Sequence, residues 1–133
     1  MKARCIANMG DKLSQSAIKG GYNPNTLFHL NVGDTYVIYG VNYWRGTTNY
    51  LTMNAPGSRP IWSPAELFQL IDYRIPPNWY YKYLITDDLI LNSVMGYKEL
   101  AMDPKHHDGL LAGEAQALKL FFERKQEIDN FHA

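Results

Sequence analysis

The alternation of hydrophobic and polar residues in the first two thirds of the chain predicts short β-strands separated by turns. Residues 36–44 are rich in β-branched and aromatic residues, which favour strands. Arg45-Gly46-Thr47 predicts a turn, and residues 49–53 then run back as the second arm of a β-hairpin. Gly40, inside the first arm, indicates a β-bulge or a close backbone approach.

Shorter apolar runs predict further strands between glycine, proline and asparagine turns. They cover residues 2–9, 27–32, 60–62, 79–85 and 89–91, with the last two paired. Ser63 is expected to cap a single helical turn that starts at Pro64. The paired prolines Pro76-Pro77 remove two backbone donors, so residues 73–78 are expected to be irregular.

The last third of the chain changes to a helical period. Residues 96–101 predict a short helix that stops near Asp103-Pro104, and a longer helix is expected from Gly109 onward. Its apolar stripe is expected to dock on the β part, while Lys125 and Asp129 stand four residues apart and form a weak ion pair. The stripe consists of Leu111, Ala115, Leu118 and Phe122, joined by Phe121 and Ile128.

These elements predict a single α+β domain over residues 1–133, mainly β in 1–95 and mainly α in 96–133. The short strands fit a small, strongly bent antiparallel β-barrel. We therefore expect an SH3-like barrel with a C-terminal α-helix packed on it.

Composition and charge argue against a nucleic-acid binder and against a membrane-anchored protein. Thirteen basic and thirteen acidic residues cancel, which argues against a nucleic-acid binder because such proteins carry a basic excess. The chain has one cysteine, Cys5, and neither a signal-peptide pattern nor an apolar stretch of about 20 residues. We expect a cytoplasmic protein without a membrane anchor.

Reactive groups are sparse in the sequence. Asp103, His106, His107 and Asp108 form the one cluster that would suit a metal or acid/base site, but adjacent histidines point in different directions. We interpret the cluster as a polar turn before the last helix, and Cys5 as a buried, inert thiol. No P-loop, nucleophile elbow or dinucleotide-binding motif occurs. The sequence therefore predicts no catalytic residue, metal ligand or cofactor.

Aromatic residues carry the best remaining signal, because ten Tyr and three Trp exceed what a small core buries. Trp62 and Trp79 are expected in the core. Exposed aromatics beside arginines have the composition of a protein-binding hot spot. The residues predicted to lie at turns and to contact a partner are Tyr43, Arg45, Tyr73, Arg74, Asp87 and Asp88.

The order of several segments resembles a group of small uncharacterised bacterial proteins of the immunity type, associated with polymorphic and contact-dependent toxin systems. The segments are residues 32–41, 44–46, 50–51, 62–72, 77–80 and 96–100, followed by the final helix. The resemblance covers the chain from about residue 30 to its end and includes no catalytic signature. It implies a protein that neutralises a cognate toxin by tight protein–protein association.

Two other function classes remain open at this point. An aromatic groove of the barrel would make the chain a peptide- or RNA-binding adaptor. A pocket that holds His106 or His107 beside carboxylates, or a bound metal, would instead favour a small enzyme that uses the Asp103–Asp108 cluster.

Overall fold

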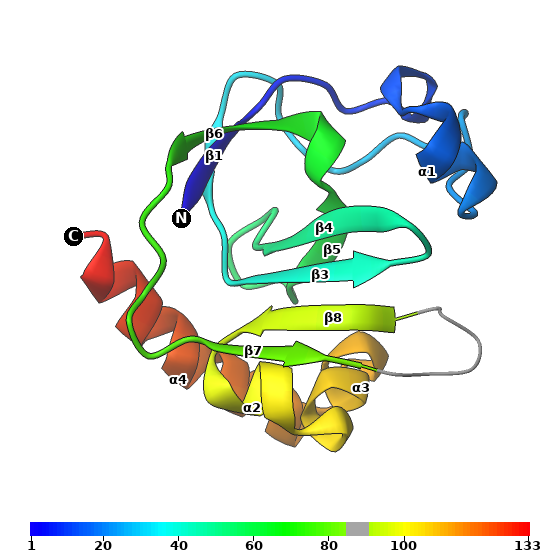
Figure 1. Ribbon diagram of the computed structural model, residues 1–133. Helices are drawn as coiled ribbons and strands as arrows, with labels where there is room; N and C mark the ends of the chain where they lie inside the picture. The colour runs from blue at the N-terminus through cyan, green and yellow to red at the C-terminus, as the bar shows by residue number, and fades with distance from the viewer. Residues whose placement is uncertain (85–90) are drawn as a thin grey trace.

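The protein is an α+β structure with two antiparallel sheets (Figure 1). The computed structural model describes residues 1–84 and 91–133. The smaller sheet has the order β2-β1-β6, with β1 at Lys2–Cys5, β2 at Thr35–Val37 and β6 at Phe68–Asp72. The larger sheet has the order β5-β4-β3-β8-β7. Its strands are β3 at Gly40–Trp44, β4 at Thr47–Thr52, β5 at Ile61–Pro64, β7 at Tyr80–Tyr83 and β8 at Leu91–Gly96.

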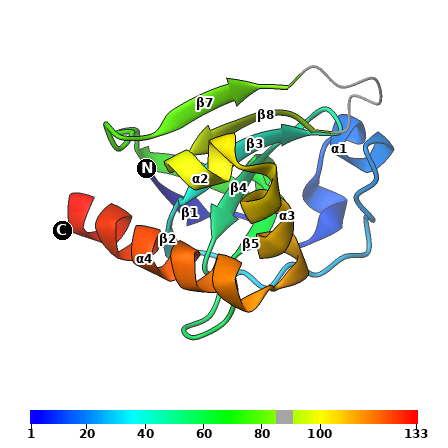
Figure 2. The ribbon, with the colours of Figure 1, turned by 90° about the horizontal axis from the view of Figure 1, so that it is seen from below.

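The main helices follow the larger sheet in the sequence and lie on one of its faces (Figures 1 and 2). The side chain of Asp103 accepts a hydrogen bond from the Lys105 amide, and Pro104 follows as the first residue of α3. Gly113 ends α3 in the left-handed conformation, at φ 72°. The helices are α1 at Gln15–Lys19, α2 at Lys98–Met102, α3 at Pro104–Ala112 and α4 at Ala115–Phe131, with single 3-10 turns η1 at Gly10–Lys12 and η2 at Ala65–Leu67.

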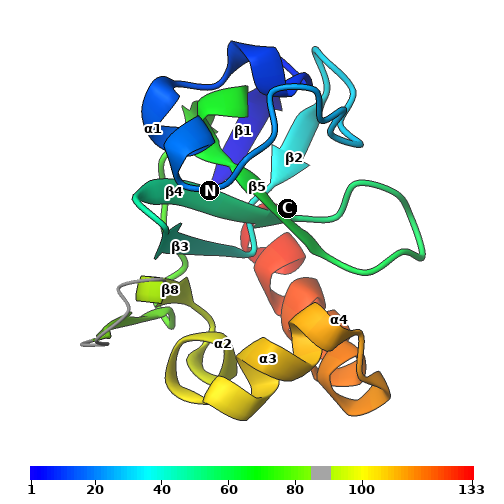
Figure 3. The ribbon, with the colours of Figure 1, turned by 90° about the vertical axis from the view of Figure 1, so that its right-hand side faces the viewer.

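The larger sheet is the middle of three layers, with α2, α3 and α4 on one side and the smaller sheet and α1 on the other (Figure 3). One core, around Leu51, Leu100 and Phe121, joins the sheet to the helices. The second core, around Ile38, Leu67 and Phe68, joins it to the smaller sheet. A side chain at Gly40 would lie 2.4 Å from Leu100 Cδ2, so the glycine allows α2 to approach the sheet. The sequence predicts a bulge or a close backbone approach at Gly40, whereas the atoms that approach it belong to the side chains of Leu100, Trp62 and Leu51.

The predicted SH3-like barrel is wrong, because the strands of residues 1–84 and 91–133 form two separate sheets and no closed barrel. The predicted strand 36–44 is the place where the two sheets divide. Ile38 is buried in the core of the smaller sheet and donates its amide to Met1, whereas Tyr39 is buried in the helix-side core and donates its amide to Leu51. Consecutive buried residues therefore face different layers, and β2 and β3 belong to different sheets.

Among the local predictions for the β part, the hairpin is confirmed, whereas those for residues 27–32 and for Ser63 are wrong. The hairpin is confirmed: β3 pairs with β4 around Arg45 and Gly46, which both have positive φ. β7 pairs with residues 93–96 of β8, not with the predicted partner strand 89–91, of which residues 89 and 90 lie outside the described residues. Residues 27–32 form only the bridge between Leu27 and Met9, so the predicted strand is wrong. Ser63 lies buried in β5 and caps no helix; η2 begins after Pro64 without a side-chain cap.

The predicted apolar stripe of the C-terminal helix is partly wrong. Gly113 and Glu114 separate α3 from α4, so Leu111 belongs to another helix than the later stripe residues and is exposed. Phe121 is completely buried, but Phe122 is 40% exposed. The buried residues of α4 are Ala117, Phe121 and Ile128. The predicted ion pair between Lys125 and Asp129 is present, at 2.6 Å.

Candidate functional site

Three exposed tyrosines stand together on the larger sheet, on the face opposite the helices. Ser93 in β8 pairs with Tyr43 in β3 on one side and with Tyr83 in β7 on the other, so the three side chains share one face. Tyr81 lies on that face too, because it is two residues from Tyr83. We call Tyr43, Tyr81, Tyr83 and Ser93 the tyrosine face. Its tyrosines are exposed by 40%, 64% and 63%, respectively.

The tyrosine face borders a depression in the surface. A depression of about 240 Å³ is lined by Tyr43 and Tyr81 and by the smaller side chains of Thr48 and Ser93. None of the residues that line it carries a charge. The same side of the sheet is covered further along by the smaller sheet, where Tyr50 is buried against Phe68. The tyrosine face is thus the uncovered continuation of a core-forming surface.

The structure does not bring the predicted contact residues to one surface. Tyr43 belongs to the tyrosine face, but the guanidinium of Arg45 lies 4.8 Å from the ring centre of Trp44, whose side chain points to the other side of β3. Asp87 and Asp88 lie outside the described residues.

Tyr73 and Arg74 follow β6. Tyr73 is exposed by 74% and lies close enough to Tyr50 to contribute, after burial, to the raised pKa of that residue. Arg74 is exposed, yet its guanidinium is held in an ion pair with Asp72 at 2.7 Å and lies over the ring of Phe131. Tyr73 is therefore available for contact, whereas Arg74 is engaged within the chain.

A second candidate site lies on the helix side of the sheet, between β3, β4, β5 and α3. Its cavity measures about 470 Å³, and its lining includes the aromatic residues Tyr22, Trp44 and Trp62. Tyr22 and Trp44 meet edge to face, with ring centres 6.1 Å apart. Asn42, Asn49, Leu91, His107, Asp108 and Leu111 complete the lining. We call this cavity the aromatic pocket.

A chain of hydrogen bonds runs along one wall of the aromatic pocket. The hydroxyl of Tyr22 donates to Asn49 Oδ1 at 2.6 Å, and Asn49 Nδ2 donates to Asn42 Oδ1 at 3.0 Å. Asn42 and Asn49 are buried and directly opposite each other in the β3–β4 hairpin. Among the described residues the side-chain nitrogen of Asn42 donates to no acceptor, and it is not one of the polar atoms sealed from solvent, so the chain ends in a donor left to solvent.

His107 forms the α3 side of the aromatic pocket. Its ring stacks on Trp62 with centres 5.9 Å apart, and the residue is only 7% exposed. Neither ring nitrogen has a hydrogen-bond partner in the described part of the chain, and Nδ1 lies 3.7 Å from an Asp108 carboxylate oxygen. Burial lowers the pKa of His107, so its imidazole is neutral at neutral pH.

The Asp103–Asp108 cluster is part of α3, not a polar turn before the last helix, and its side chains diverge. Asp103 caps the helix, while His106 lies 2.6 Å from the buried hydroxyl of Tyr97. His107 alone reaches a pocket, with the exposed Asp108 at its rim. Across residues 1–84 and 91–133, no three His, Cys, Asp or Glu side chains gather as a metal site would require. Cys5 is buried, as predicted, and burial raises its pKa.

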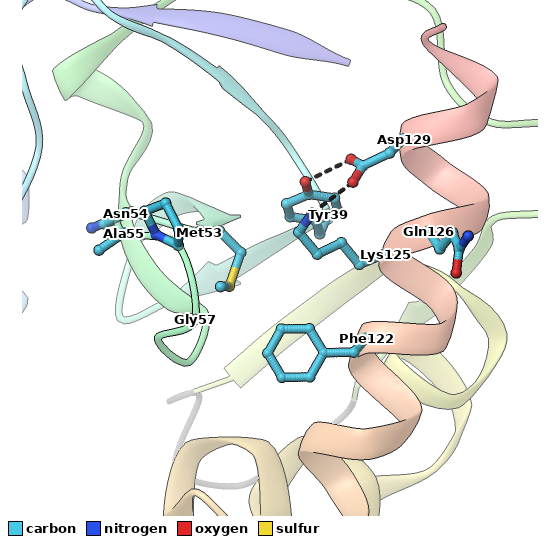
Figure 4. A pocket seen from close by; sticks show the side chains of 10 residues that line it. Tyr39, Met53, Asn54, Ala55, Gly57, Phe122, Lys125, Gln126 and Asp129 are labelled. Atoms are coloured by element: carbon cyan, nitrogen blue, oxygen red, sulfur yellow. Dashed lines mark hydrogen bonds and ion pairs between the residues drawn. The ribbon is translucent and has the colours of Figure 1, made fainter.

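A third, more open cleft lies between α4 and the loop that joins β4 to β5 (Figure 4). Its volume is about 600 Å³, and Phe122 and Met53 face each other across it. Three of its polar groups satisfy one another: Tyr39 donates to Asp129 at 2.7 Å, and Lys125 pairs with the other carboxylate oxygen. The cleft thus offers fewer unmet groups than the aromatic pocket.

Sequence reasoning missed Tyr81, Tyr83 and the convergence of Tyr22 with Asn49. Alternation along residues 79–83 separates Tyr81 and Tyr83 from Tyr80, but it leaves open which set faces outward. Nothing in the sequence links Tyr22 to Asn49, which is 27 positions away.

Comparisons of the chain with protein-family models, with curated proteins and with solved structures found no match. None of the helices in the described residues has the length and apolar character needed to cross a bilayer.

Proposed function

We propose that this protein works by binding another protein through the tyrosine face. The observation that carries the proposal is the group of three exposed, cross-strand tyrosines around Ser93, two of which, Tyr43 and Tyr81, line an uncharged depression. Tyrosine provides a large apolar contact with a polar tip and loses little entropy when it is fixed, which is why it is enriched among the residues that dominate binding energy.

The expected occupant is a folded protein that inserts an uncharged side chain into the depression. Strand pairing fixes the backbones beneath Tyr43 and Tyr83, so little ordering is needed on binding. A stable interface buries roughly 800 Å² on each partner, which exceeds the area of a few side chains. We therefore expect the contact to extend beyond the tyrosine face to the exposed Tyr73.

For the biological role we propose neutralisation of a cognate bacterial toxin in the cytoplasm. The segments that resemble immunity proteins support this role, and an inhibitor of this kind needs only affinity, not a catalytic group. The peptide- or RNA-binding alternative depended on the groove of a barrel, and the two-sheet fold removes its basis. The enzyme alternative keeps one supporting feature, the pocket with His107 beside Asp108, but its other cluster members lie elsewhere.

The toxin role is tested by expressing the gene adjacent to this one in its native genome. We expect its product to arrest growth of a host cell, and co-expression of this protein to restore growth. No arrest, or arrest that this protein fails to relieve, contradicts the toxin role.

The contact surface is tested on the same pair of proteins by calorimetry. Tyr81→Thr combined with Tyr83→Thr should weaken binding by about 30-fold if one tyrosine is a hot spot and by up to about 900-fold if both are, since each hot-spot tyrosine contributes roughly 2 kcal/mol. Threonine keeps the strand propensity, so the melting temperature should stay nearly constant. The matched control is Tyr80→Thr, which changes a 43% exposed tyrosine on the opposite face of β7. Equal affinity in the double variant and the control would contradict the proposed surface.

A further inference from the structure

We propose that the aromatic pocket is a binding site for a small, uncharged, planar heteroaromatic molecule of the nucleobase type. This site lies on the helix side of the larger sheet, whereas the tyrosine face lies on the opposite side. The two proposals are therefore independent of each other.

The shape and lining of the cavity favour a flat ring system. Its volume of about 470 Å³ lies in the range of small-molecule sites, which combine apolar walls with a few polar groups. Three of its nine lining residues, Tyr22, Trp44 and Trp62, present aromatic rings. Stacking on such rings contributes to the binding of any planar molecule, so the walls select for flatness.

The polar groups of the pocket favour a ring with hydrogen-bonding atoms at its edge. Tyr22 and Asn49 use their polar atoms on each other and on Asn42, and the chain ends at the unused side-chain nitrogen of Asn42. A donor at the end of such a chain is polarised by the bonds before it, and a ring nitrogen or carbonyl of the ligand would accept from it.

His107 supplies the second polar group. Both ring nitrogens of His107 are buried without a hydrogen-bond partner. Such burial lowers the stability of the fold, because the hydrogen bonds to water in the unfolded chain are not replaced. In its neutral form the ring has one donor and one acceptor, which match the edge of a nucleobase. The stack on Trp62 holds the ring without any hydrogen bond, so a small shift of the ring would expose a nitrogen to a ligand.

Charge around the pocket disfavours a phosphate-bearing ligand. Asp108 lines the pocket, and 81% of its side chain is exposed to solvent. Its carboxylate would repel the backbone of a nucleic-acid strand. The guanidinium of Arg45 lies over the ring of Trp44. It also packs against Gly21, because a Cβ added to that glycine would lie 2.8 Å from Arg45 Nη1. We therefore infer a free small molecule as the ligand.

Nuclear magnetic resonance of the ¹⁵N-labelled protein tests the site, because its three tryptophans give three separate indole signals. Adenine is the probe, indole is a planar analogue with a donor and no ring acceptor, and cyclohexanecarboxamide has an amide edge without a planar ring. Adenine should shift the signals of Trp44 and Trp62 with a Kd on the order of 1 mM or tighter. Trp79, outside the pocket, serves as the internal control and should not move.

Binding of adenine is expected to exceed that of indole and of cyclohexanecarboxamide at least five-fold. Equal binding of indole would overturn the hydrogen-bonding part of the proposal, and equal binding of the carboxamide would overturn the planar part. Tighter binding of a six-nucleotide oligoadenylate than of adenine would overturn the assignment to a free small molecule. No shift of Trp44 or Trp62 with any of these compounds at 10 mM would overturn the site itself.

His107→Phe separates a ligand-binding role from a structural one. Phenylalanine keeps the stack on Trp62 and removes both unpartnered nitrogens, so the melting temperature should rise while adenine affinity falls at least five-fold. Unchanged affinity, or a lower melting temperature, would contradict the role given to His107. Trp44→Leu, at a half-buried position, provides a second variant and should abolish the shift of Trp62.

Discussion

In two pairs of adjacent apolar residues, the two side chains lie in different surroundings. Ile38 and Tyr39 face different cores, and Phe121 is completely buried while Phe122 is 40% exposed. The sequence shows that these residues are apolar. The direction of each side chain depends on which face of the strand or helix turns toward the core. In both pairs that face is set by tertiary packing.

The environments of Phe121 and Phe122 predict different effects of truncation. Phe121→Ala should lower the free energy of unfolding by about 3–5 kcal/mol, because it leaves a cavity where three aromatic rings meet. Phe122→Ala, the matched control in the same helix, should cost less than about 1 kcal/mol. Urea denaturation measures both. Equal costs would show that α4 is rotated relative to the orientation described here.

Two buried histidines predict that acid destabilises the fold. Burial lowers the pKa values of His106 and His107 from the ordinary value of 6.5. Well above pH 6.5 both rings are neutral in the folded and the unfolded chain, whereas an unfolded histidine is about half protonated at pH 6.5. As the pH falls below 6.5, the unfolded chain takes up protons that the folded chain does not, so the free energy of unfolding must decrease.

Denaturation midpoints at pH 7.5, 6.5 and 5.5 measure this effect. The decrease should be concentrated below pH 6.5, and each buried histidine adds at most about 1.4 kcal/mol per pH unit. His107→Phe should reduce the dependence of the denaturation midpoint on pH. A stability that rises between pH 6.5 and 5.5 would mean that these imidazoles are charged in the folded state.

At the scale of elements, glycines decide where helices and sheet meet. Gly40 and Gly96 are paired in β3 and β8, and a Cβ on either would lie within 2.7 Å of Leu100 Cδ2. Gly113 separates α3 from α4 through its left-handed conformation. The sequence indicates the importance of Gly40, but it does not identify Leu100 as the residue that approaches it. Contacts that join residues 60 positions apart depend on the layer order, which local patterns do not encode.

Gly40→Ala should therefore push α2 away from the sheet and cost about 1–3 kcal/mol of stability. The matched test is a double-mutant cycle with Leu100→Ala, which removes the methyl group that the new Cβ would meet. In the Leu100→Ala background, Gly40→Ala should cost clearly less than it does alone, as measured by urea denaturation. Additive costs would show that Leu100 does not limit the approach.

At the scale of the whole molecule, the class of fold was accessible from the sequence and the architecture was not. The α+β class, the β3–β4 hairpin, the irregular segment after β6 and the short helix α2 follow from local composition and turn chemistry. The division into two sheets does not, because it takes place within the continuous apolar run of residues 36–44. The predicted barrel treated that run as one strand.

The candidate sites also depend on the order of strands and layers in the fold. Tyr43 was predicted as a contact residue because it precedes a turn, but its neighbours Tyr81 and Tyr83 join it only through the order β3-β8-β7. The aromatic pocket likewise unites Tyr22, Trp62 and His107 from three separate parts of the chain. The residue types were visible in the sequence, whereas their convergence required the fold.

The most direct test of the proposed contact surface is hydrogen–deuterium exchange on the protein alone and in complex with the partner that co-purifies from an extract of its native cells. Binding through the tyrosine face predicts slower amide exchange in β7 and β8, with exchange in α2, α3 and α4 unchanged. Slower exchange in the helices, with β7 and β8 unaffected, would contradict the account.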